Sequence, residues 1–137
     1  LVEQYKKVGV KAEIQLIEWS AWLTDVYKAR EYEATIVGLD SALAPSDVVK
    51  RYTSTAKNNF INYESAAFDA LFAKALASVN EAEKIALYKE IQQTLTKDAA
   101  SVYLQDGAKL VAVNKKYTNF LFYPVYVLDM AAIKPAQ

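Results

Sequence analysis

The first forty residues contain two segments that predict β-strands and, between them, one that predicts a helix. Apolar and polar residues alternate from Val10 to Leu16, which is typical of a strand with one buried face. Apolar residues recur at helical spacing from Trp19 to Arg30. Ala34–Leu39 is a short apolar run of the kind found in strands covered on both faces. Strand, helix and strand in this order predict a right-handed βαβ unit.

Helices are expected in the middle of the sequence. A short helix is predicted around Asp47–Tyr52, and the polar, Asn-rich stretch Thr53–Tyr63 predicts a surface loop. Two amphipathic helices follow, and the second begins with Asn80 and Glu83 in a pattern that resembles a capping box. The short break between these helices predicts a helical hairpin.

The last third of the chain predicts strands. Ser101–Asn114 has the pattern of a β-hairpin around Asp106-Gly107, because both residues of such a turn tolerate positive φ. Apolar, β-branched and aromatic residues from Phe120 to Ile133 predict one or two further strands. Together the elements predict one α/β domain over residues 1–137, with a βαβ unit, a mixed sheet, a helical hairpin and C-terminal strands.

The composition excludes several kinds of chemistry. The 137 residues include no cysteine and no histidine, which removes thiol nucleophiles, Cys/His zinc sites and triads with a histidine base. The formal net charge is zero and no basic block occurs, so no nucleic-acid partner is expected. The sequence has three glycines and no Gly-rich phosphate loop. We therefore do not expect an enzyme, and we expect no catalytic residue, metal site or cofactor.

The first nine residues have the pattern of a helix that is ending. Leu1, Tyr5 and Val8 share one face, lysines occupy the last turn, and Gly9 suits the position after a helix C-terminus. We expect the sequence to be a segment of a longer protein, in which an export signal would come earlier.

Six short segments carry a resemblance to a known family. They are Tyr5–Glu13, Ile17–Trp19, Ala34–Gly38, Asn62–Asp69, Glu81–Lys89 and Lys115–Tyr117. In this order and spacing they resemble the C-terminal lobe of bacterial extracellular solute-binding protein family five, the oligopeptide- and dipeptide-binding proteins of ABC transporters. The resemblance covers almost the whole chain.

This resemblance implies both a fold and a role. It implies one lobe of a periplasmic-binding-protein-like type II fold, in a two-lobed protein that closes on a solute. The protein would capture small peptides outside the membrane and deliver them to an ABC permease. The implied partners are therefore a peptide or similar solute, the N-terminal lobe of the same protein and the permease. The implied location is extracellular or periplasmic, with a lipoprotein anchor.

The resemblance also implies ligand-binding residues. In relatives, the tryptophan that opens the helix after the first strand lines the pocket, and Trp19 occupies that position here. A loop after the second strand commonly holds an aspartate that pairs with the peptide α-ammonium group, because a buried charge needs a partner. The corresponding loop here contains Leu39, Asp40, Ser41 and Ala42, and Asp40 is the expected carboxylate. This loop is one residue shorter than in relatives, and its aspartate stands at a different offset from the preceding glycine.

Some of these residues have simpler interpretations. Trp19 also suits a core position on an amphipathic helix, and Trp22 is expected in the core. Asp47 is expected to begin a helix, where its charge favours the helix dipole.

The shortened loop leaves other ligands open. Oligosaccharides and metal chelates are alternatives to peptides, and tyrosine and tryptophan faces suit sugar stacking. A glycoside-hydrolase lobe with two carboxylates is a further alternative. The asparagines of the polar loop are either ligand contacts or, more simply, solvated residues; they are Asn58, Asn59 and Asn62.

Overall fold

The computed structural model describes residues 1–40, 42–108, 110–123 and 127–136 and divides into two compact units. The first unit is Leu1–Ile36 and the second is Val37–Gln137.

The first unit is built from short helices. Helix α1 covers Val2–Lys7 and ends before Gly9, whose φ of +82° confirms the predicted helix end. Helix α2 covers Trp19–Ala21 and continues into a π-helical segment, η1, at Trp22–Lys28. Arg30 ends this helical stretch with a positive φ of 65°, and its guanidinium donates a hydrogen bond to the Tyr27 carbonyl. The predicted helix of this region is therefore confirmed, with a π-helical second half.

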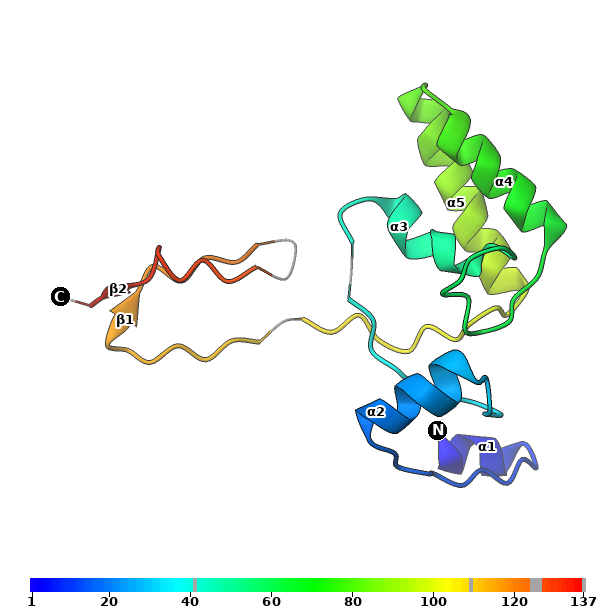
Figure 1. Ribbon diagram of the computed structural model, residues 1–137, viewed down its shortest axis with the longest axis horizontal. Coiled ribbons are helices and arrows are strands. Elements are labelled where there is room, and N and C mark those ends of the chain that lie inside the picture. Colours follow the sequence, from blue (N-terminus) through cyan, green and yellow to red (C-terminus); the bar gives the residue numbers. More distant parts are fainter. Residues whose placement is uncertain (41, 109, 124–126, 137) are drawn as a thin grey trace. The chain divides into compact units, whose positions relative to one another are not determined.

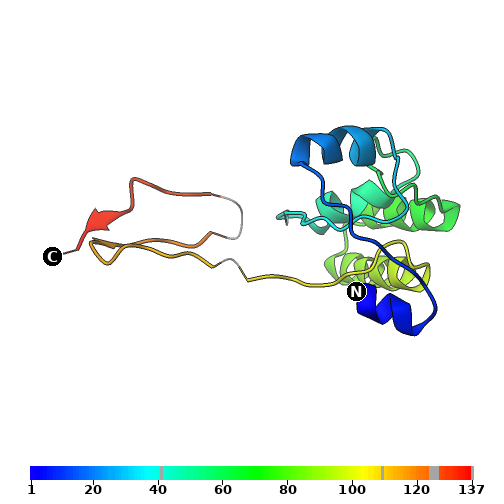
Figure 2. The same ribbon diagram turned by 90° about the horizontal axis from the view of Figure 1, so that it is seen from below.

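The second unit contains the predicted helical hairpin. Helix α3, Pro45–Val49, continues into the 3₁₀ turn η2, Lys50–Tyr52, and confirms the expected short helix. Helices α4, Ala66–Ala77, and α5, Glu81–Lys97, lie side by side in Figures 1 and 2. The Asn80 side chain accepts a hydrogen bond from the Glu83 backbone N–H at 3.0 Å, which confirms the predicted N-cap.

One hydrophobic core holds these helices together. It contains buried side chains from α3, η2 and both members of the hairpin, with Phe68, Ile91 and Leu95 at its centre. Tyr52, Tyr63 and Phe68 pack edge to face around it, an arrangement that aromatic pairs favour. All of its buried members lie between residues 49 and 95. The buried residues are Val49, Tyr52, Phe68, Phe72, Ala75, Leu87, Ile91 and Leu95.

The strand predictions were wrong for three segments. Residues 10–16, 34–39 and the described part of 101–114 are extended or irregular and form no strand; residue 109 of the predicted hairpin lies outside the described residues. The described residues form one sheet, in which β1, Tyr117–Thr118, pairs antiparallel with β2, Lys134–Pro135. Between these strands, the predicted strands of Phe120–Ile133 are absent from the described positions, and residues 124–126 lie outside them. The chain is thus helix-rich with a small sheet, which fits part of an α/β lobe.

The reason for these errors lies in what makes a strand. An extended segment becomes a strand only when a neighbour satisfies its backbone N–H and C=O groups. No such neighbour pairs with residues 10–16 or 34–39 in the part of the chain that the structure describes. Their apolar side chains are consequently exposed, as shown by the 91% exposed Leu16 and the 71% exposed Ile36.

Among the described residues, no helix has both the length and the apolar character needed to cross a membrane.

Candidate functional site

The first candidate, Trp19, is exposed and lies on another aromatic ring. It opens α2 directly after the extended residue Glu18, and 58% of its surface is exposed. Its ring is stacked on that of Trp22, with 4.9 Å between ring centroids and 4° between ring planes. The interpretation of Trp19 as a core residue is therefore wrong. One face of its ring is covered by Trp22, and more than half of the residue remains exposed.

Trp22 is buried, as predicted for a core residue. Its indole Nε1–H donates a hydrogen bond to Thr35 Oγ1 at 2.9 Å. Tyr27 lies on the same helical stretch, with its ring centroid 5.9 Å from that of Trp22. Arg30 in turn lies over the Tyr27 ring, 5.9 Å from its centroid. Sequence reasoning identified the two tryptophans but missed Thr35, because a polar residue in an apolar run carries no signal of its partner.

The predicted ligand loop belongs to the second unit. Leu39, Asp40 and Ala42 are all exposed, whereas Ser41 lies outside the described residues. Within the described part of the chain, no ion pair involves the Asp40 carboxylate. Trp19 belongs to the other unit, so neither unit alone contains the whole predicted set.

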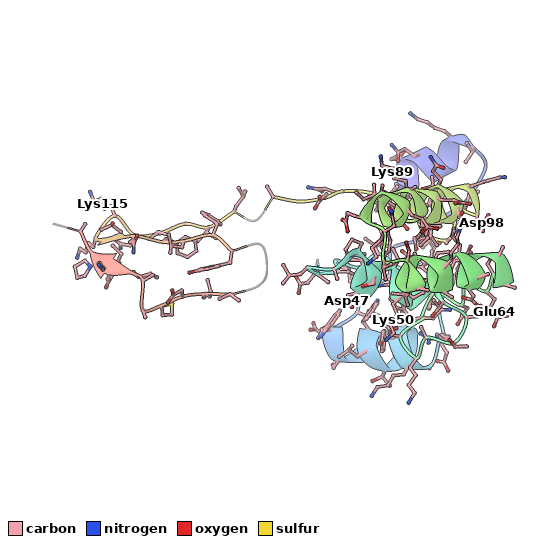
Figure 3. All side chains as sticks on the ribbon, turned by 90° about the horizontal axis from the view of Figure 1, so that it is seen from above. Asp47, Lys50, Glu64, Lys89, Asp98 and Lys115 are labelled. Atoms are coloured by element: carbon pink, nitrogen blue, oxygen red, sulfur yellow. The ribbon has the colours of Figure 1, made fainter. Side chains whose placement is uncertain are left out.

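Asp47 has a structural role at the start of a helix. It stands in the first turn of α3, where a carboxylate favours the helix dipole, as the sequence predicted. Figure 3 shows it on the same short helical stretch as Lys50.

The asparagines of the polar loop divide into different roles. Asn59 is buried, and its side-chain amide donates to the Thr53 carbonyl at 3.3 Å and to the Tyr63 carbonyl at 2.7 Å. Its Oδ1 accepts from the Tyr63 backbone N–H at 3.3 Å. Asn62 has a φ of 57°, a conformation that asparagine tolerates well. The interpretation of Asn59 as a solvated residue is therefore wrong: its side chain holds the loop closed.

A shallow depression lies on the same loop. It has a volume of about 450 Å³ and contains two lysines and two threonine hydroxyls, none of them buried. No pattern in the sequence singles out these lysines and threonines. The lining residues are Lys50, Thr53, Thr55, Ala56, Lys57 and Asn58.

Several tyrosine hydroxyls are hydrogen-bonded around the helical core. The Tyr103 hydroxyl donates to the Tyr52 hydroxyl at 3.2 Å, and Tyr52 donates to Ser101 Oγ at 3.3 Å. Loss of solvation and the hydrogen bond with Tyr52 raise the pKa of Tyr103. The Tyr63 hydroxyl donates to Asp98 Oδ2 at 2.6 Å, at the C-terminal end of α5 (Figure 3). Loss of solvation and this contact raise the pKa of Tyr63 as well.

The acidic side chains that the structure describes are spread over the chain. Over the described ranges, no group of three or more Asp and Glu side chains is placed to hold a metal ion. The hydrogen bonds among Tyr52, Tyr63, Tyr103 and Asp98 at the surface of the core account for the positions of these polar groups.

Comparison with known proteins gives a consistent picture. The periplasmic oligopeptide-binding protein OppA of Escherichia coli K12 is 30% identical over 108 residues, which are 77% of this chain and 20% of that protein. The oligopeptide-binding protein AppA of Bacillus subtilis 168 is 22% identical over 125 residues, which are 89% of this chain and 23% of that protein. The chain is a relative of these oligopeptide-binding proteins. The family resemblance noted in the sequence is thereby confirmed.

A shorter match is to a protein named as a dipeptide-binding protein. The probable D,D-dipeptide-binding periplasmic protein DdpA of Escherichia coli K12 is 33% identical over 63 residues, which are 46% of this chain and 12% of that protein. No family model matches the chain. The chain spans about a fifth of the length of the OppA and AppA relatives.

Proposed function

We propose that this chain is a C-terminal-lobe segment of the solute-binding component of an ABC importer that captures oligopeptides or dipeptides. The observation that carries the proposal is the similarity to oligopeptide-binding proteins over 77% and 89% of the chain. The chain acts by binding and not by catalysis, since its relatives are named as binding proteins. In this proposal residues 1–137 belong to one lobe of a type II fold, completed by an N-terminal lobe.

The proposed place of action follows from the same relatives. OppA and DdpA are periplasmic proteins, so the protein would act outside the cytoplasmic membrane and deliver its solute to a permease. A lipoprotein anchor would hold it at the membrane surface in a bacterium without a periplasm.

The proposed ligand contacts are the exposed ring of Trp19 and the loop containing Leu39, Asp40, Ser41 and Ala42. A flat apolar ring contributes contact area to almost any side chain with little loss of side-chain entropy. The exposed Asp40 carboxylate would pair with the α-ammonium group of the peptide. Such a contact is charge-assisted and would select peptides with a free N-terminus.

The experiment that tests the proposal compares free and N-acetylated peptides. In the complete natural protein that contains residues 1–137, calorimetry should detect binding of short peptides. Asp40→Ala should weaken binding of a free peptide by about 2 kcal/mol, or about 30-fold, because the buried ammonium loses its partner. Acetylation should weaken binding to the natural protein similarly and add little to the effect of Asp40→Ala.

Asp47→Ala is the matched control, because it removes a carboxylate that stands at a helix start nearby in sequence. It should leave peptide affinity unchanged. Equal effects of the two substitutions, or full additivity of Asp40→Ala with acetylation, would remove Asp40 from the site. Failure of every short peptide to bind would refute peptide capture itself.

Oligosaccharide binding is the second candidate, and the open face of Trp19 favours it. Sugars present apolar C–H faces that stack on such a ring. Calorimetry with a linear oligosaccharide in place of the peptide distinguishes the two proposed functions. A peptide-binding protein should bind only the peptide tightly, and an oligosaccharide-binding protein only the oligosaccharide.

A further inference from the structure

The first unit contains a stack of planar side chains that is anchored at its buried member. The stacked indoles of Trp19 and Trp22, here called the aromatic shelf, lie 4.9 Å apart and almost parallel. Trp22 is 7% exposed, while Trp19 is 58% exposed. The shelf thus has an inner ring that is fixed by its surroundings and an outer ring with a face that is open.

Thr35 holds the inner ring through a polar contact. An indole has one hydrogen-bond donor and no acceptor, and the Trp22 donor is directed at Thr35 Oγ1 at 2.9 Å. Because an indole plane can rotate about two side-chain torsions, this bond selects one orientation of the ring. Thr35 is 13 residues away in sequence, so the contact also ties the segment after η1 to the helix that carries both tryptophans.

The orientation of Trp22 is passed on to Trp19. An exposed tryptophan in the first turn of a helix is otherwise free to change rotamer, which costs affinity when a ligand immobilises it. The broad, nearly parallel contact with Trp22 favours one rotamer of Trp19 before any ligand arrives. Pre-orientation of this kind raises affinity by lowering the entropy lost on binding.

We propose that Thr35 is a positioning residue for the aromatic shelf: its hydroxyl orients Trp22, and Trp22 in turn orients the ligand-facing ring of Trp19. The positioning itself is independent of ligand identity. The consequence for affinity rests on the proposed function, because it requires that a solute contacts Trp19.

Nuclear magnetic resonance of the indole N–H groups tests the positioning directly. Residues 1–137 contain two tryptophans, whose indole signals are assigned in the complete natural protein by replacing each with phenylalanine in turn. Exchange with solvent at the Trp22 indole should be slower than at Trp19 by about tenfold or more, since the Trp22 group is buried and hydrogen-bonded.

Three substitutions then separate the hydroxyl from its surroundings. Thr35→Val keeps the shape and removes the acceptor, so it should reduce the protection of the Trp22 indole and shift both indole signals as the stack loosens. Thr35→Ser keeps the acceptor, so the protection of Trp22 and the positions of both indole signals should match those of the natural protein. Thr24→Val is the matched control, because it removes a hydroxyl that donates to the Ser20 carbonyl on the same helical stretch.

Signals that stay in place in Thr35→Val, or that move equally in Thr24→Val, would overturn the proposal. If Thr35→Val does not fold, solvent exchange of the Trp22 indole in the natural protein and in Thr35→Ser tests the proposal. An unprotected Trp22 indole in the natural protein would then refute the contact, and protection retained in both would support it.

Binding of the peptide Ala-Phe-Ala by the complete natural protein supplies the functional test. Thr35→Val should weaken it about threefold to tenfold, in the range expected for a positioned aromatic contact, and Thr35→Ser should not. If the indole signals respond as expected but the natural protein binds no peptide, the proposed function fails and the positioning role stands. If peptide affinity is unchanged by Thr35→Val while the signals move, the shelf does not serve the ligand.

Discussion

Replacement of Asn59 should destabilise the second unit strongly, because this loop side chain is part of its hydrogen-bonded interior. The side chain is buried and joins three backbone groups, the Thr53 and Tyr63 carbonyls and the Tyr63 N–H. Each such bond contributes about 1 kcal/mol net, and leaving a buried partner unsatisfied costs more. Asn59→Ala should therefore lower the free energy of unfolding by about 3 kcal/mol.

Urea unfolding followed by far-ultraviolet circular dichroism measures this loss, because α4 and α5 dominate the helical signal. For a small domain, 3 kcal/mol corresponds to a midpoint lowered by roughly 1–3 M urea. Asn58→Ala is the matched control, since the neighbouring side chain is exposed and should change stability by less than about 0.5 kcal/mol. Equal midpoints for the two variants would refute the role assigned to Asn59.

Asn59→Asp adds a prediction about pH. The introduced carboxylate has nearly the shape of the amide but places a negative charge against two carbonyl oxygens, so its pKa in the folded state should rise above the ordinary value of about 3.9. A raised folded-state pKa means that the protonated form fits better. Relative to Asn59→Ala, this variant should be most stable below about pH 4 and should lose stability as the pH rises through the raised pKa. An increase in relative stability with rising pH would contradict the proposed geometry.

Three further substitution experiments test other parts of the second unit. Ile91→Ala should cost about 3 kcal/mol of unfolding free energy because Ile91 is 0% exposed, while Ile85→Ala, at a 49% exposed position of the same helix, should cost less than about 0.5 kcal/mol in the same urea assay. Asn62→Gly should preserve stability at φ 57°, whereas Asn62→Val should lose about 1–2 kcal/mol, as measured by thermal unfolding. In a spectrophotometric titration, Tyr103 should be among the tyrosines that ionise late, because loss of solvation and the Tyr52 hydroxyl raise its pKa, and Tyr52→Phe should bring its ionisation nearer to the usual pH. The stability from this contact should be complete below about pH 10 and should fall as the pH rises further.

The helices of the second unit could be predicted from the sequence because their determinants are local. An α-helix satisfies its own backbone groups, so capping residues and a 3.6-residue apolar pattern suffice to indicate it. Asn80 caps α5 as the pattern predicts, and Pro45 stands at the first position of α3, two residues before the predicted start of that helix. The burial of Phe68 and Ile91 could also be predicted, because each lies on the apolar stripe of its helix.

The sheet could not be predicted in the same way, because a strand depends on a neighbour that its own sequence does not encode. The alternation from Val10 to Leu16 indicates an extended conformation with one apolar and one polar face. Among the described residues, no neighbouring strand pairs with this segment. β1 and β2 show the opposite case, since Tyr117 pairs with Pro135 across 17 intervening residues without an alternating pattern at either end.

The same distinction between local and distant partners separates the two parts of the proposed peptide site. The aromatic shelf is held by contacts within Leu1–Ile36, so its shape exists before a ligand binds. Asp40 is exposed, and an attraction of about 1 kcal/mol between unit charges at 4 Å in water becomes about 4 kcal/mol only when the effective dielectric constant falls to about 20. If Trp19 and Asp40 bind the solute as proposed, Trp19 would contribute affinity for many side chains at first contact, whereas Asp40 would select a free N-terminus only as water leaves its surroundings. Discrimination between free and acetylated peptides should accordingly depend on how completely the protein encloses its solute, while stacking on Trp19 should not.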